Sequence, residues 1–515
     1  MHDNRWVPDE FATPDAAPGG RRLSSLLVGA LLLANVVVTL DHSGTVVALP
    51  AIRDTFGTGI GALVWVQIAP AIAGVAIAGP GGAVGDRLGR GRVMLAGMAI
   101  FAAGALGSAL APSRTGAGPW ELITARFLAG AGDTVITVLS LALLTSSVTR
   151  ARIAWMVGFW TAFSSGAAAL APFVSGVIVD TLGWRWVFGL PVIPMAAAAL
   201  VMLVTRPQFA STAGTTVGWT GGALLAGALS LLAAGVAAVD KQGSGLANAA
   251  ILLAAGAVLL VGFAVAQRRS ADPLVRWSQL RAPGIIAALV VRALVALTFA
   301  GAMFEVTLLL LNALGYSPAA AGAMDIPPAA AAIAASAASS GISGRIGTTR
   351  ARALGCAALG VGVAGTSAIG DCPSPWLIGA SLTIVGAGYG LLTATLGAAV
   401  LAALPRGSHG QGSGALAFAG QGPGVLGVSL IGIITAAVTQ GVWRSQTTGP
   451  CGTDPRVLSA VGSGALSDIA DRCGDALGAT ARTIYIDGVT SVLRVVAVIL
   501  GLVAVGALWG YRRVV

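Results

Sequence analysis

The chain has 515 residues, of which 56% are apolar and only 10% are charged. Soluble proteins carry about 25% charged residues, so the composition excludes an ordinary soluble domain and indicates an all-α protein with many membrane spans. The net charge of +10 is scattered over short connecting segments rather than gathered in one patch, which argues against a nucleic-acid partner.

Fourteen apolar runs are each long enough to cross about 30 Å of hydrocarbon as a helix. The polar stretch before them, residues 1–23, lacks the charged-then-apolar order of a cleavable signal and is expected to be a disordered cytoplasmic tail. The runs lie at residues 24–49, 60–80, 91–111, 119–144, 150–178, 184–205, 217–239, 246–267, 284–311, 318–341, 350–370, 375–400, 410–439 and 488–511.

Positive residues in the connecting segments orient these runs. With the N-terminus inside, nineteen arginines fall on the inner side, and eight positive residues fall on the outer side, half of them in one long loop. Cytoplasmic loops of membrane proteins are enriched in Lys and Arg, and long loops carry little weight in that rule. The bias predicts that both termini are cytoplasmic.

The segment from Gly81 to Arg92 (GGAVGDRLGRGR) separates the second and third runs with a charged, glycine-rich turn. Unpaired charge and irregular backbone are costly in hydrocarbon, so this turn is expected at the cytoplasmic surface. A related segment, Gly341 to Arg350, follows the tenth run. The repeat predicts two six-helix halves, 24–205 and 284–511, with an inserted helix pair and linker at 206–283 and an outer loop at 440–487.

The four cysteines form no metal-binding pattern, so no metal site is expected. Cys356 lies in an apolar run and is expected in the core. Cys451 and Cys473 share the long outer loop and can pair if the outside is oxidising. That loop is either a small cap over the outer mouth or a tolerated insertion, and the sequence favours neither.

Ionisable residues inside a membrane span are functional candidates, because burying a charge in hydrocarbon is costly. Asp41 in the first run and Arg126 in the fourth lie at similar depth and are expected to pair, either as a static ion pair or as a pair that protonation of Asp41 opens. Asp133 follows Arg126 by seven residues, about two turns, and is expected to face the bundle interior as a proton-exchanging group or a substrate contact. His42 is a candidate proton relay or a hydrogen-bond partner of Asp41.

The second half carries its own ionisable residues. Glu305 and Asp325 are candidate contacts for a cationic substrate. Asp325 precedes Pro327 and Pro328, which are expected to interrupt that helix and free carbonyl groups toward a cavity. Arg292 is expected to balance an acid or to attract an anionic group.

Several segments match patterns of a known family. The segment Gly81–Arg92 is similar to G-x-L-A-D-R-x-G-R-K, with Val84, Gly85 and Gly91 in place of Leu, Ala and Lys. Leu40-Asp41 and Val47–Pro50 match the two ends of the first-helix pattern L-D-x-T-I-V-N-V-A-L-P, and residues 43–46 depart from it. Arg126, Gly130 and Gly132 match R-x-x-Q-G-x-G, with Ala129 in place of Gln. Ala171-Pro172, Ser175-Gly176 and Trp184–Phe188 add to the match. The chain resembles the fourteen-helix drug:proton antiporter branch of the major facilitator superfamily; Asp133 is not supplied by that pattern.

The resemblance implies a proton-driven exporter of amphipathic, cationic or neutral hydrophobic compounds that works by alternating access in the cell membrane. It implies that Asp41 and Arg126 couple protons and that the fifth helix is a hinge, with Gly166, Pro172 and Gly176 as candidate hinge residues. The candidate gating residues of the cytoplasmic turn are Gly82, Asp86, Arg87, Gly89, Arg90 and Arg92.

The expected partners are a small-molecule substrate, protons and the lipid bilayer, with no cofactor and a single protomer as the working unit. No nucleotide-binding loop and no catalytic motif occur in the sequence, so neither ATP drive nor an enzyme is expected. The alternatives are a dedicated exporter of an endogenous metabolite or lipid, an importer, and a non-transporting membrane sensor.

Overall fold

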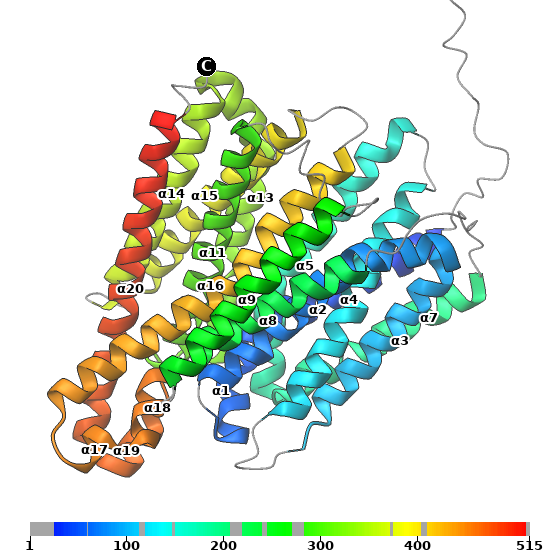
Figure 1. Ribbon diagram of the computed structural model, residues 1–515. Coiled ribbons are helices and arrows are strands. Elements are labelled where there is room, and N and C mark those ends of the chain that lie inside the picture. Colours follow the sequence, from blue (N-terminus) through cyan, green and yellow to red (C-terminus); the bar gives the residue numbers. More distant parts are fainter. Residues whose placement is uncertain are drawn as a thin grey trace, which may run out of the picture.

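The computed structural model describes residues 25–58, 60–112, 119–146, 150–205, 219–238, 245–269, 283–370, 374–402 and 409–510. The regular secondary structure of these residues is entirely helical (Figure 1). The predicted tail over residues 1–23 lies outside the described residues.

The helices fall into three groups along the chain. The first is α1 (Ser25–Phe56), α2 (Ile60–Leu88), α3 (Arg90–Ala109), α4 (Trp120–Ser146), α5 (Arg150–Leu182), α6 (Arg185–Gly189) and α7 (Val192–Thr205). The second is the hairpin of α8 (Trp219–Ala238) and α9 (Gly245–Arg269). The third is α11 (Pro283–Asn312), α12 (Pro318–Ala323), α13 (Ile326–Ile346), α14 (Thr348–Ser367), the 3-10 turn η1 (Ala368–Gly370), α15 (Pro375–Ala402), α16 (His409–Gln446), α17 (Pro450–Thr453), α18 (Pro455–Ser463), α19 (Leu466–Cys473) and α20 (Asp475–Gly510).

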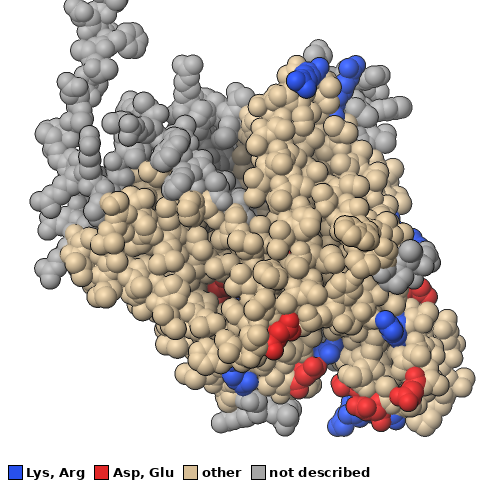
Figure 2. Space-filling view, turned by 180° about the vertical axis from the view of Figure 1, so that it is seen from behind, with Lys and Arg blue, Asp and Glu red and all other residues tan. Residues whose placement is uncertain are grey.

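Each of the fourteen predicted runs falls on one helix or on two consecutive helices. Nine helical segments of the described residues are long and apolar enough to cross a membrane, and three shorter apolar stretches add to them. Figure 2 shows charged side chains near the ends of one face, with uncharged residues over most of the body between. The count of fourteen crossings and the side on which the termini lie stay predictions.

The first and third groups each form a bundle. In the first bundle α4 packs on α2 and α3, and α1 packs on α5; in the second bundle α15 packs on α13 and α14, and α11 packs on α16. The α8–α9 hairpin packs on α2 and α16, so it touches both bundles. Closely packed apolar side chains fill the interior of each bundle.

The two bundles meet closely where α5 crosses α12. A Cβ placed on Gly176 would lie 2.2 Å from the Pro318 carbonyl oxygen, and one on Gly322 would lie 2.2 Å from the Pro172 carbonyl oxygen. Each helix therefore sets a glycine against the backbone of the other at a proline. At the same place Asp180 Oδ2 accepts a hydrogen bond from the Ala319 N–H of α12 at 3.0 Å.

Two junctions differ from the predicted runs, and a third confirms a predicted interruption. The segment from Gly81 is not an extended turn, because α2 continues to Leu88 and only Gly89, with φ of 94°, separates it from α3. The sixth run is divided between α6 and α7 next to Pro191, which lacks the N–H that a continuous helix would use. The tenth run is interrupted between α12 and α13 at Asp325, as the following prolines predicted.

The predicted loop 440–487 is largely helical. Helix α16 continues to Gln446, α20 begins at Asp475 rather than near residue 488, and α17–α19 form a small cap between them. A disulfide joins Cys451 to Cys473 across the cap. The cap has its own apolar core around Trp443, Val461 and Ile469, to which the short amphipathic helices α18 and α19 contribute.

Candidate functional site

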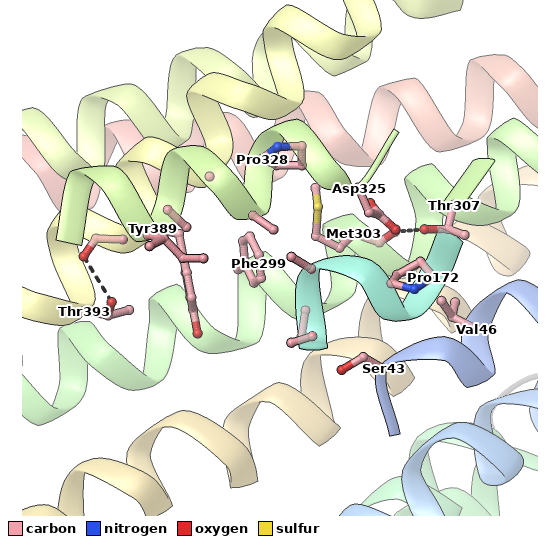
Figure 3. Close-up of a pocket in the computed structure, with 18 of the residues that line it drawn as sticks. Ser43, Val46, Pro172, Phe299, Met303, Thr307, Asp325, Pro328, Tyr389 and Thr393 are labelled. Carbon is pink, nitrogen blue, oxygen red and sulfur yellow. Dashed lines mark hydrogen bonds between the residues drawn. The ribbon is translucent and has the colours of Figure 1, made fainter. Parts of the chain in front are cut away.

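A cavity of about 880 Å³ lies between the two bundles. The first bundle contributes residues of α1, α2 and α5 to its wall, and the second contributes residues of α11, α13, α15 and α16. The close-up in Figure 3 labels Ser43, Val46, Pro172, Phe299, Met303, Thr307, Asp325, Pro328, Tyr389 and Thr393 among its lining residues. A cavity of this size, shared by two bundles, suits a drug-sized molecule.

Asp325 brings a carboxyl group to the wall of this cavity, which alanines and other apolar side chains otherwise dominate. It stands at the break between α12 and α13, next to Pro327 and Pro328, and its side chain does not cap the helix that follows. Because the side chain is not used in capping, it is free to face the cavity. Among the described residues it is the only acid that lines the cavity.

Two stacked aromatic rings lie toward the other end of the cavity in Figure 3. The rings of Phe299 and Tyr389 are 4.0 Å apart between centroids and nearly parallel. Arg292 stands behind Tyr389: its Nη1 donates to the Tyr389 hydroxyl at 3.4 Å, and its guanidinium lies 5.6 Å from the ring centroid. Arg292 does not itself line the cavity, but it contacts Tyr389, which does.

A second cluster of charge lies inside the first bundle. Arg126 Nη1 donates to Asp41 Oδ2 at 2.6 Å, and Arg126 Nη2 donates to the Thr45 hydroxyl at 3.0 Å. The Arg126 side chain is 1% exposed, and its guanidinium also lies 4.8 Å from the centroid of the Phe188 ring. Removing only one partner of such a buried pair strongly destabilises a protein, because the other charge is left buried and uncompensated.

Helix α1 presents opposite faces to the ion pair and to the cavity. Asp41 and Thr45 face Arg126 of α4, whereas Ser43 and Val46 line the cavity. Residues two apart on a helix point in nearly opposite directions, since each residue turns the chain by about 100°. The ion pair therefore does not contact the cavity. A movement of α1 would nevertheless change both the ion pair and the cavity wall.

The remaining candidates lie away from the cavity wall. Asp133 Oδ1 accepts from the Thr137 hydroxyl at 3.1 Å inside the first bundle, and His42 is half-buried beside Asp41. Glu305 is 2% exposed and packs against α16 near Gly432. The predicted substrate contacts of Asp133 and Glu305 are thus not with this cavity, and the proton-coupling roles of Asp41, Arg126, Asp133 and His42 stay predictions.

The candidate gating residues lie around the α2–α3 junction. Arg90 Nη1 donates to the Ala142 carbonyl of α4 at 3.5 Å, within the first bundle. Arg87 and Arg92 are exposed, Gly82 and Gly89 are half-buried, and the Asp86 side chain is outside the described part of the chain. Their gating role stays a prediction.

The candidate hinge residues differ from one another. Pro172 and Gly176 lie in the α5–α12 crossing, whereas a Cβ on Gly166 would meet nothing within 4 Å. The hinge role itself stays a prediction.

Sequence reasoning missed Phe299, Tyr389 and Thr307 of the cavity wall, and Asp180 and Gly322 of the crossing. One signal was available: Pro172 and Gly176 are four residues apart, as are Pro318 and Gly322, so the two crossing segments share a Pro-x-x-x-Gly spacing. Nothing in the sequence marks Phe299 or Tyr389, because aromatic residues are common in apolar helices.

Comparisons with known proteins agree with this geometry. The family model described as Major Facilitator Superfamily matches residues 31–428. The chain is 32% identical over 423 residues to the drug efflux pump JefA of Mycobacterium tuberculosis, and this alignment covers 81% of each chain. It is 30% identical to the lincomycin resistance protein of Streptomyces lincolnensis, in an alignment that covers 68% of this chain and 71% of the relative. It is 27% identical to the tetracenomycin C resistance and export protein of Streptomyces glaucescens, which covers 61% of this chain and 57% of that relative.

Solved structures share the fold. A bacterial homologue of the human lysosomal transporter Spinster, in an inward-facing and unoccupied conformation, superposes with a TM-score of 0.69 at 16% identity, which covers 96% of this chain and 98% of that chain.

Proposed function

We propose that this chain, which belongs to the major facilitator superfamily, exports amphipathic cationic or neutral hydrophobic compounds in exchange for protons. The family consists of transporters, and the apolar helices make the chain a multi-pass protein of the bacterial cell membrane. The relatives named for drug efflux and antibiotic resistance support a drug exporter.

One observation carries the exchange part of the proposal. The buried Asp41–Arg126 pair and the cavity lie on opposite faces of α1. Protonation of Asp41 removes its charge and weakens its bond to Arg126, so α1 is released from α4. A shift of α1 then changes the cavity wall at Ser43 and Val46. Proton binding and substrate binding are thereby linked through one helix rather than through one shared position.

Substrate recognition follows from the composition of the cavity wall. An apolar body packs against alanines, Met303 and the stacked Phe299 and Tyr389 rings, and a positive group pairs with Asp325. Neutral compounds use the apolar wall alone. The two bundles then rock about the α5–α12 crossing, where glycines on both helices permit close contact.

The proton gradient supplies the drive. A membrane potential of 100 mV is worth about 2.3 kcal/mol for each charge moved, which is enough for roughly fifty-fold accumulation. No nucleotide or cofactor is required for such a cycle.

The test uses proteoliposomes loaded with a pH-sensitive dye and ethidium as a lipophilic cation. An imposed pH gradient should drive ethidium movement, and a protonophore should stop it. Asp41→Asn should abolish gradient-driven movement, whereas Asp54→Asn, at the exposed end of the same helix, should leave it intact. Ethidium movement that is indifferent to both the protonophore and Asp41→Asn would contradict the exchange mechanism.

A second function, export of one endogenous compound, is favoured by relatives that are named for resistance to a single antibiotic. A panel of cations and neutral compounds in the same liposomes separates the two. Broad transport supports a multidrug exporter, transport of a single chemical class supports a dedicated exporter, and no flux of any solute supports a sensor.

A further inference from the structure

A stripe of polar side chains runs along the face of α4 that points into the first bundle. Arg126, Asp133, Thr137 and Ser140 are spaced by seven, four and three residues, which places them on one side of the helix. The other residues around this stripe are largely apolar, and the stripe ends in the half of α4 nearer to the α2–α3 junction. Polar groups in a continuous row inside an apolar bundle need an explanation beyond packing.

Hydrogen bonds extend this row across α1 and α5. The Thr137 hydroxyl donates to Asp133 Oδ1 at 3.1 Å, and Trp160 Nε1 of α5 donates to the Ser140 hydroxyl at 3.2 Å. Asn35 Nδ2 of α1 donates to the Ser164 hydroxyl of α5 at 2.5 Å, one turn beyond Trp160. None of these residues lines the cavity between the bundles.

The ion pair at the start of the row has unused bonding capacity. Asp41 Oδ1 and Arg126 Nε are buried and have no hydrogen-bond partner in the described part of the chain. Such groups inside proteins are normally satisfied by water when no side chain reaches them. Asp133 is the next acid along α4, about 10 Å further on, and lies within electrostatic reach of both Asp41 and Arg126.

We propose that Asp133 is an inner proton carrier, which takes the proton from Asp41 and releases it toward the α2–α3 end of the first bundle, along a route separate from the substrate cavity. In this step the O–H bond on Asp41 breaks and an O–H bond on Asp133 forms, with water as the bridge between the two carboxyls. Arg126 stabilises the Asp41 carboxylate that is left behind. The inference rests on the proposed proton-coupled export.

The charged and titratable groups around Asp133 fit this role. Helix α1 contributes Asp41 and His42, and α4 itself contributes Arg126. Helix α5 contributes the uncharged Trp160 and Ser164, and the arginines of α2 and α3 lie at the ends of those helices. Arg126 is already bonded to Asp41, so within the described residues no cation forms a salt bridge with Asp133 and its carboxyl can change protonation state.

The test separates proton movement from substrate binding. In proteoliposomes, exchange of labelled for unlabelled ethidium needs no net proton movement, whereas accumulation against a gradient does. Asp133→Asn should keep exchange within about twofold of wild type and lower gradient-driven accumulation about tenfold or more. Asp133→Glu should restore accumulation. Glu121→Gln, an exposed acid in the first turn of α4, is the matched control and should change neither.

Accumulation that is unaffected by Asp133→Asn would overturn the inference. Loss of exchange together with accumulation, without recovery in Asp133→Glu, would also overturn it, because that result describes a structural residue. If wild-type protein moves ethidium without moving protons, the proposed exchange itself fails, so the two failures are distinguishable.

Discussion

The two bundles use their charges differently. In the first bundle Asp41 and Arg126 form a buried ion pair, and neither residue lines the cavity. In the second bundle Asp325 lies on the cavity wall, and no salt bridge of Asp325 or Glu305 occurs in the described residues. A charge that is neutralised inside a bundle can respond to a proton but cannot touch a ligand. A charge left on the wall can select a ligand. This difference supports the proposal that the first bundle binds the proton and the second selects the substrate.

The largest effect is expected from removing one member of the buried pair. Arg126→Met leaves Asp41 buried and uncompensated, which should destabilise the protein by about 3–5 kcal/mol. The double variant Asp41→Asn with Arg126→Met should recover most of that stability without recovering gradient-driven transport. Thermal unfolding in detergent measures the first effect and proteoliposome transport the second. If Arg126→Met is as stable as wild type, the ion pair is not buried as the structure shows.

The next effect concerns the crossing on which the bundles are proposed to rock. Gly176→Val places side-chain atoms where the Pro318 carbonyl stands and should cost about 1–3 kcal/mol and most of the transport activity. Gly166→Ala in the same helix meets nothing within 4 Å and is the matched control. Comparable losses in both variants would show that replacing any glycine of α5, rather than the contact at the crossing, is responsible.

A smaller and more selective effect is expected on the cavity wall. Asp325→Asn should raise the KM for a lipophilic cation about tenfold and leave a neutral hydrophobic substrate within about twofold, since only the cation uses the carboxylate. Transport kinetics for the two substrates in one preparation make the comparison. Equal changes for both would place Asp325 in the structure of the α12–α13 break instead of in recognition.

The smallest effect on transport is expected from the cap, which belongs to the second bundle but reaches the first. Arg53 of α1 and Asn312 of α11 both donate to the Ser463 carbonyl, at 3.4 and 3.3 Å. Replacing Cys451 and Cys473 by Ser opens a closed segment with a sequence separation of 22 residues and should destabilise the cap by about 3 kcal/mol. Hydrogen exchange should accelerate in α18 and α19, with transport changed less than about twofold.

Loss of transport in the Cys451→Ser, Cys473→Ser variant would assign the cap a part in the transport cycle. The variant Cys356→Ser removes a buried free thiol of α14 and serves as the control for loss of a cysteine.

The ion pair was predictable from the sequence because Asp41 and Arg126 are charged residues inside otherwise apolar runs. Their similar depths in the membrane follow from the rise of the helix per residue. The interruption at Asp325 was predictable because Pro327 and Pro328 act on the local backbone. A small cap was one of the two alternatives for this loop, but its helices were missed because α18 and α19 are short, and a short amphipathic pattern is weak against the glycines around it. The aromatic stack of Phe299 and Tyr389 was missed because its two members are ninety residues apart.

The sequence by itself determined the class of protein and the position of each apolar run, because hydrocarbon requires length and apolarity from every segment independently of its neighbours. Which side chains reach the cavity was decided only by the tertiary structure. Asp41 and Ser43 are two residues apart, yet one faces α4 and the other faces the cavity, since the rotation of α1 is set by the helices packed around it.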